Sequence, residues 1–126
     1  MSTYNAVTWL LDRNVEEGRG SKLAFTDTVN ELTYGELQRQ SCRAANLLRR
    51  LGVRREERVA MIMLDTVDFP IVFLGAIRAG VVPVPLNTLL TSDQYAYVLS
   101  DSRARVLFVS EALYPVVKDV VGHLPD

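Results

Sequence analysis

The residues of this chain that could do acid–base or metal chemistry are few and scattered. Asp65 and Asp68 follow an apolar run, where proteins of alternating strands and helices often bind ligands. Capping of the helix that begins here explains both carboxylates without any chemistry. His123 is the only histidine, which excludes a histidine-based triad and a metal site with several histidines. Cys42 is the only cysteine, so neither a disulfide framework nor a thiolate metal cluster is expected.

Two further groups of residues could form a binding surface, but each has an ordinary structural explanation. Glu56 and Glu57 interrupt a run of arginines that no aromatic residues interleave, so we interpret the run as a solvated face. Four tyrosines could line a pocket, although aromatic side chains at helical spacing more often pack in a core or on a surface. The arginines are Arg49, Arg50, Arg54, Arg55 and Arg58, and the tyrosines are Tyr34, Tyr95, Tyr97 and Tyr114.

A glycine-rich loop that could hold phosphate groups is not found in the sequence. Neither G-x-x-x-x-G-K-[ST] nor G-x-G-x-x-G occurs, and the 7 glycines mostly mark turns and helix ends. We therefore expect no catalytic, cofactor-binding or metal-binding residue in this chain.

Length and composition set the broad class of protein. A chain of 126 residues fits one domain with a single core. Hydrophobic residues make up 48%, charged residues 23%, and the formal net charge is −1, as in a globular protein rather than a disordered or nucleic-acid-binding one. The longest apolar stretch, residues 69–77, is far shorter than the roughly 20 residues that cross a bilayer. With no targeting pattern at the N-terminus and no cysteine pair, we expect a cytoplasmic protein without nucleic-acid or membrane partners.

Hydrophobic spacing in the first half of the chain predicts a helix, a hairpin and a second helix. The first helix covers residues 6–16, and Leu23 and Phe25 alternate with polar or small residues in the first strand of a hairpin that turns at residues 27–30. Thr33 and Glu36 have the spacing of a capping box, so the second helix begins there. This helix stops at Gly52 in a left-handed conformation. Its inward stripe is predicted to contain Leu37, Ala44, Leu48 and Leu51, widened by Ala45 and Leu47.

The second half of the chain alternates strands and helices. Residues 58–64, RVAMIML, read as a strand covered on both faces, and a helix capped by Thr66 is expected to end at Gly80 in a left-handed conformation. Strand, helix and strand in this order imply a parallel crossover. In the next strand, residues 81–86, Pro83 and Pro85 remove two amides on the same side, so it can pair mainly through its other side.

The last elements complete an α/β pattern. Thr91 and Gln94 repeat the capping spacing before a helix that carries Tyr95, Val98 and Leu99. A buried strand, RVLFVS, follows, and the final helix runs over residues 110–121 with its regular part starting near Tyr114 because of Pro115.

Two of these segments, in this order and at this distance, resemble a known family. LTYGEL (residues 32–37) and IRAGVVPVPLN (residues 77–87) are similar to the first two core segments of the AMP-forming adenylating enzymes. That family includes acyl- and aryl-CoA ligases, firefly luciferase and the adenylation domains of nonribosomal peptide synthetases. Residues 55–110 resemble bacterial benzoate-CoA ligases in particular, and the resemblance covers nearly the whole chain.

The resemblance implies a two-step reaction. A carboxylate attacks the α-phosphate of ATP to give an acyl adenylate, and the thiol of CoA then displaces AMP. It implies ATP, Mg²⁺ and CoA as cofactors of the whole enzyme and a small, benzoate-like aromatic carboxylate as its substrate. In that family the phosphate loop, the acidic residues that hold the nucleotide and the adenylation lysine lie downstream of the matching segments, and this chain contains none of them. Some relatives also have a basic residue, near the CoA phosphates, two positions after the asparagine that matches Asn87, where this sequence has Leu89.

The resemblance further implies that residues 1–126 are an N-terminal α/β segment of the large adenylation domain, truncated before the ATP-binding motifs and inactive alone. The expected fold is a partial N-terminal subdomain, a mostly parallel sheet with flanking helices and an N-terminal hairpin. Its partner would be the remainder of the adenylation domain, and uncovered strands predict that the isolated chain self-associates. Two alternatives stay open: a segment of another adenylating enzyme, such as a fatty acyl-CoA ligase or a peptide-synthetase domain, and a self-sufficient binding or oligomerisation module.

Overall fold

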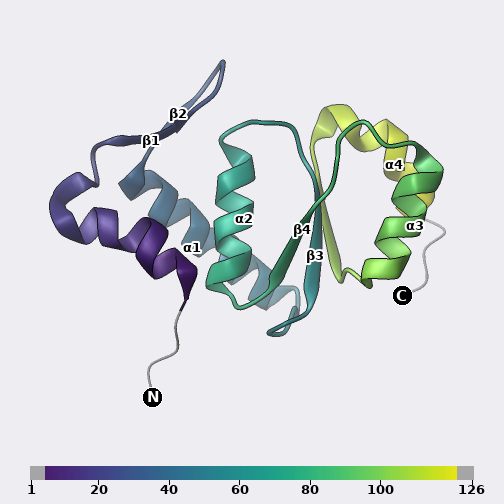
Figure 1. The fold of residues 1–126 in the computed structure, drawn as a ribbon, viewed down its shortest axis with the longest axis horizontal. Coiled ribbons are helices and arrows are strands. Elements are labelled where there is room, and N and C mark those ends of the chain that lie inside the picture. Colours follow the sequence, from purple (N-terminus) through teal and green to yellow (C-terminus); the bar gives the residue numbers. More distant parts are fainter. Residues whose placement is uncertain (1–4, 122–126) are drawn as a thin grey trace.

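The computed structural model describes residues 5–121 and contains an antiparallel hairpin and a three-stranded parallel sheet among helices (Figure 1). The N-terminal helix begins at Ala6 and includes two π-helical stretches, η1 (Thr8–Asp12) and η2 (Val15–Arg19), and Gly18, with a φ of 88°, kinks the second. The remaining elements are β1 (Leu23–Thr26), β2 (Glu31–Thr33), α1 (Tyr34–Arg50), β3 (Arg58–Ile62), α2 (Asp68–Arg78), β4 (Val82–Pro85), α3 (Ser92–Ser102), β5 (Val106–Val109), η3 (Glu111–Leu113) and α4 (Tyr114–Val121). The predicted α/β class, with a parallel sheet and an N-terminal hairpin, is confirmed.

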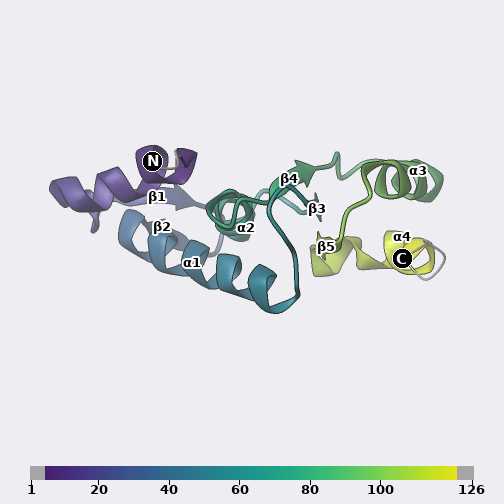
Figure 2. The same cartoon turned by 90° about the horizontal axis from the view of Figure 1, so that it is seen from below.

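The parallel sheet has β3 at its centre, with β4 on one side and β5 on the other. Residues 59–62 of β3 are each 0% exposed, which confirms a strand covered on both faces. Val59 packs with the side chains of α1 and α2, whereas Ala60 and Ile62 pack with those of α3 and α4. Figure 2 shows the two pairs of helices on opposite sides of the sheet. A third apolar cluster joins the N-terminal helix and the hairpin to α1 and α2; its buried members are Val7, Leu11, Leu32, Leu37, Val67 and Leu74.

The ends of the elements follow the predicted turn residues with one exception. Gly52 and Gly80 have φ values of 80° and 76°, which confirms both left-handed helix ends. Thr91 and Gln94 form a complete capping box, and the hydroxyl of Thr33 caps α1. The prediction that Thr66 caps α2 is wrong. The helix starts at Asp68, and the backbone carbonyl of Thr66, not its side chain, accepts the amide of Phe69 at 3.1 Å.

Two predicted faces also differ from the structure. On α1, the buried stripe is Leu37, Ser41, Ala45 and Leu48, while Leu47 and Leu51 are exposed. Polar Ser41 takes a core position because it is hydrogen-bonded there, and residue type alone does not reveal such a partner. On β1, Leu23 and Phe25 are exposed and Ala24 packs against the core. The hairpin register shifts between Leu23 and Phe25, and this irregularity is not encoded in the alternation of the sequence.

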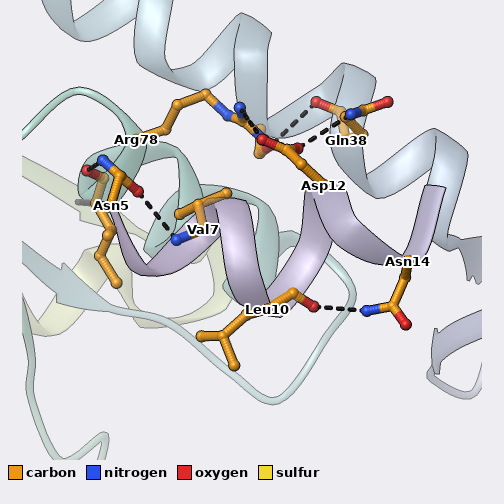
Figure 3. A network of polar contacts seen from close by, with 9 residues as sticks. Asn5, Val7, Leu10, Asp12, Asn14, Gln38 and Arg78 are labelled. Atoms are coloured by element: carbon orange, nitrogen blue, oxygen red, sulfur yellow. Dashed lines mark hydrogen bonds and ion pairs between the residues drawn. The ribbon is translucent and has the colours of Figure 1, made fainter. Parts of the chain in front are cut away.

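A polar network ties the N-terminal helix to α1 and α2 (Figure 3). Arg78 of α2 holds the Asp12 carboxylate through two bonds, from Nη2 to Oδ1 at 2.8 Å and from Nη1 to Oδ2 at 3.0 Å. The Asp12 Oδ1 also accepts the amide of Gln38 at 3.0 Å, and Arg78 donates to the Ser41 hydroxyl. The side chains of Arg78 and Asp12 are only 20% and 17% exposed. No pattern in the sequence indicated this network.

The hydrogen bond from Arg78 is the main cause that lowers the pKa of Asp12, against the opposite effect of burial, and Gln38 adds to the lowering. The ionised carboxylate therefore stabilises the folded chain. That contribution is complete above the ordinary carboxyl pKa and is lost as the pH falls through the lower pKa of the folded state.

We predict that Asp12→Asn lowers the free energy of unfolding by about 1–3 kcal/mol at pH 7, because the half-buried guanidinium of Arg78 loses its charged partner. The difference from the unsubstituted chain should shrink as the pH falls below about 4. Urea denaturation across this pH range measures both values. Asp65→Asn, which alters an exposed carboxylate, is the control and should change little. A difference that stays constant from neutral to strongly acidic pH would contradict the assigned role of the ion pair.

We also predict that Gly75→Ala destabilises the chain by roughly 1–3 kcal/mol through overpacking. A methyl group there would lie 2.6 Å from Cβ of Ala44 and 3.0 Å from the carbonyl oxygen of Ser41, so α1 and α2 would have to separate. Gly20→Ala is a matched control, since its methyl group would meet only Val15 at an ordinary 3.7 Å. Thermal melts of both variants make the comparison, and equal stability of the two would show that the helices do not need this close approach.

Candidate functional site

The candidate site is the carboxyl-terminal edge of the parallel sheet, where α/β proteins bind ligands. Three segments meet along this edge: residues 63–67 after β3, residues 86–91 after β4, and Ser110 after β5. In Figure 1 they run along the upper end of the sheet.

Hydrogen bonds within the chain fix all three segments. The amide of Leu64 donates to the Ser110 hydroxyl at 2.9 Å and so joins the segments after β3 and β5. The buried Tyr95 donates its hydroxyl proton to the carbonyl of Asn87 at 2.8 Å. The Asn87 side chain in turn accepts the amide of Leu89 at 2.8 Å. Hydrogen bonds within the chain therefore hold the loops of this edge in place.

Asp27, in the turn of the hairpin, fixes the start of α2 from outside the sheet. Its carboxylate accepts the amides of Val29 and Asn30 at 2.7 and 2.6 Å, and its second oxygen accepts the amide of Val67 at 2.9 Å. The amide of Asn30, followed by those of Val67 and Val29, lowers the pKa of Asp27. The D-x-x-N spacing identifies the turn, but no signal in the sequence indicates the contact with Val67, 40 residues away.

The structure places the sequence candidates at this edge apart from one another. Asp65 and Asp68 are exposed, and neither carboxylate takes part in a hydrogen bond or ion pair within residues 5–121. Asp68 lies in the first turn of α2, where a negative charge is favourable. Within the described part of the chain, no three of the His, Cys, Asp and Glu side chains are grouped so that they could hold a metal ion.

The tyrosines do not form one pocket. Tyr95 is buried among the side chains of α3, α4 and the sheet, and Tyr34 packs against the N-terminal cluster. Tyr97 is 71% exposed, and it lines a shallow apolar hollow on α3 with Leu90 and Val98. Tyr114, also exposed, begins α4.

The arginines and the remaining candidates are likewise dispersed. Arg49 bonds to Asn46 on its own helix, and Arg58 donates to the carbonyl of Ser102, so the run of arginines follows exposed parts of several elements. Cys42 is a free, half-buried thiol on α1. His123 lies outside the described residues. No helix within residues 5–121 combines the length and the apolar character that crossing a membrane requires.

A family match, similar sequences and a similar solved structure all relate this chain to the same group of proteins. The family described as AMP-binding enzyme matches residues 11–125. The 4-hydroxybenzoate–CoA/benzoate–CoA ligase of Rhodopseudomonas palustris is 55% identical over 97% of this chain and 23% of its own length. The benzoate–CoA ligase of Thauera aromatica is 45% identical over the same shares. A solved benzoate CoA ligase of Burkholderia xenovorans LB400 superposes with a TM-score of 0.91 at 45% identity, over 96% of this chain and 24% of that one.

The chain thus spans about a quarter of the length of the relatives it matches, 23% in both of the curated ligases. The family match and the similarity to the solved structure each cover nearly all of its residues, including the two core segments. This chain belongs to the AMP-binding enzyme family.

Proposed function

We propose that this chain is the N-terminal segment of the large adenylation domain of an aryl-CoA ligase, and that the whole enzyme joins a benzoate-like carboxylate to CoA. The observation that carries this proposal is the 55% identity, over nearly the whole chain, to a ligase named for benzoate and 4-hydroxybenzoate. The second relative and the solved structure are also named as benzoate ligases.

In the proposed reaction, a carboxylate oxygen of the aromatic acid attacks the α-phosphorus of ATP, and the bond to pyrophosphate breaks. The thiol sulfur of CoA then attacks the acyl carbon of the adenylate, and AMP leaves with the bonding electrons. The whole enzyme would use ATP and CoA, with Mg²⁺ accompanying the ATP. We assign none of these contacts to residues 1–126.

The role of this segment in the proposed enzyme is to position the residues that do the chemistry. Asp27 and Ser110 hold the loop after β3, and Tyr95 holds the loop after β4. Leu89, which is 88% exposed on that second loop, replaces a basic residue of some relatives, so we assign no CoA phosphate contact to it.

The partner of the segment is then the remainder of the adenylation domain, and we assign the whole enzyme to the cytoplasm. We also propose that the isolated chain associates with copies of itself, because an open strand edge recruits another chain. A segment of a fatty acyl-CoA ligase or a peptide-synthetase domain is the alternative within the family, and a self-sufficient module is the alternative outside catalysis.

We expect the isolated chain to catalyse no exchange of labelled pyrophosphate into ATP, with or without benzoate or 4-hydroxybenzoate. The reason is that it contains no phosphate loop and no adenylation lysine. The full-length Rhodopseudomonas palustris ligase serves as the positive control. Exchange above blank that depends on the added acid would contradict the assignment of the chemistry to residues outside this chain.

A hybrid enzyme tests the positioning role directly. When this chain replaces the matching quarter of the Rhodopseudomonas palustris ligase, kcat/KM for benzoate should stay within roughly tenfold, about 1.4 kcal/mol of transition-state stabilisation. The preference for benzoate over 4-hydroxybenzoate should also be unchanged. A folded hybrid with a new acid preference would show that these residues determine specificity, and a folded but inactive hybrid would count against membership in this group of ligases.

A further inference from the structure

We propose that Asp27 is a positioning residue of the proposed enzyme and that its two carboxylate oxygens have separate roles. One oxygen shapes the tip of the hairpin. The other fixes the loop after β3 and the start of α2, so the hairpin tip is part of the candidate site although it lies outside the parallel sheet. This inference rests on the proposed function and names a residue on which substrate binding by the whole enzyme depends.

The Oδ1 atom of Asp27 belongs to the hairpin. It accepts the amides of Val29 and Asn30 at 2.7 and 2.6 Å. The amide of Asp27 also donates to the carbonyl of Asn30 at 2.9 Å, so a backbone hydrogen bond closes the same turn. An asparagine side chain forms turns of this kind as well, because its one oxygen can accept both amides. The turn alone therefore does not require a carboxylate.

The Oδ2 atom acts on α2, which has no side-chain cap of its own at Val67. Pro70 has no N–H group, and the carbonyl of Thr66 accepts the amide of Phe69 at 3.1 Å. The amide of Val67 donates to Oδ2 of Asp27 at 2.9 Å. The hairpin thus supplies the cap, and its negative charge lies at the end of α2 where the helix dipole favours it.

The loop after β3 is held at both of its ends by residues of other elements. Ser110 accepts the amide of Leu64, and Asp27 accepts the amide of Val67. Between these two points the amide of Thr66 donates to the carbonyl of Leu64 at 2.8 Å, which forms a tight local turn. Figure 1 shows the tip of the hairpin at the same end of the molecule as this loop. Without the Asp27 contact the loop would be attached at one end only.

Asp27→Asn separates the roles of the two oxygens. The asparagine oxygen can keep the amides of Val29 and Asn30, whereas the NH₂ group then faces the amide of Val67, which is another donor. The variant therefore keeps the turn and loses the contact with α2. Glu31→Gln is the matched control, because it removes a negative charge from an exposed position of the same hairpin.

Amide hydrogen exchange of the chain, followed by NMR, measures the effect on the loop. In Asp27→Asn we expect the amides of Thr66 and Phe69 to exchange at least roughly tenfold faster, although neither is bonded to Asp27. The amides of β3 should change little, and Glu31→Gln should resemble the unsubstituted chain. Unchanged exchange at Thr66 and Phe69 would overturn the proposal, because the loop would then keep its shape without the second oxygen.

Kinetics of the hybrid ligase described above test whether this loop serves the site. Asp27→Asn should raise KM for the acid, ATP or CoA by roughly tenfold and change kcat little, because the substrate then binds a loop that is ordered only part of the time. A lower melting temperature with every KM unchanged would show a purely structural role and overturn the positioning role. An inactive unsubstituted hybrid would count against the proposed function alone, and the exchange comparison would still decide whether Asp27 fixes the loop.

Discussion

The contact between α1 and α2 is the interaction on which the rest of this structure depends. Gly75 allows the two helices to approach until a single added methyl group would collide with Ala44. One turn further along α2, Arg78 reaches across to Asp12 and Ser41, so the same approach fixes the N-terminal helix. Because one side of this helix pair carries the N-terminal cluster and the other covers the sheet, a shift between α1 and α2 would be transmitted to both.

The contact between α1 and α2 also determines the shape of the carboxyl-terminal edge of the parallel sheet. The start of α2 is held by Asp27 from the hairpin, and the hairpin is held by the cluster that α1 and α2 complete. The loops after β3 and β4 are thus set by contacts with elements far away in the sequence. A segment of this kind can position a neighbouring active site without contributing a reacting group, which agrees with the role proposed for it.

Local signals in the sequence predicted the elements well and the long-range polar contacts not at all. Gly52, Gly80 and the Thr91–Gln94 box correctly placed helix ends because the cause of each lies within a few residues. Ser41 and Asp12 have their partners on other elements, so neither periodicity nor composition could indicate them. The prediction that Thr66 caps α2 failed for the same reason. The carboxylate of the distant Asp27 accepts the amide of Val67, as the side chain of a local cap would have done. The candidate edge followed from the parallel topology, but the groups that hold it did not.

The two edges of the parallel sheet differ in their ability to pair with a further strand. Pro83 and Pro85 have no N–H groups, so the outer edge of β4 cannot complete a ladder at any pH or salt concentration. The outer edge of β5, in contrast, has no neighbouring strand in the described chain. If the chain is a segment of a longer ligase, further strands of that enzyme and a second copy of the segment compete for the same open edge. A strand of the same chain has the higher effective concentration and therefore pairs with this edge in preference to a second copy. The self-association proposed for the isolated segment is therefore not expected of the whole enzyme.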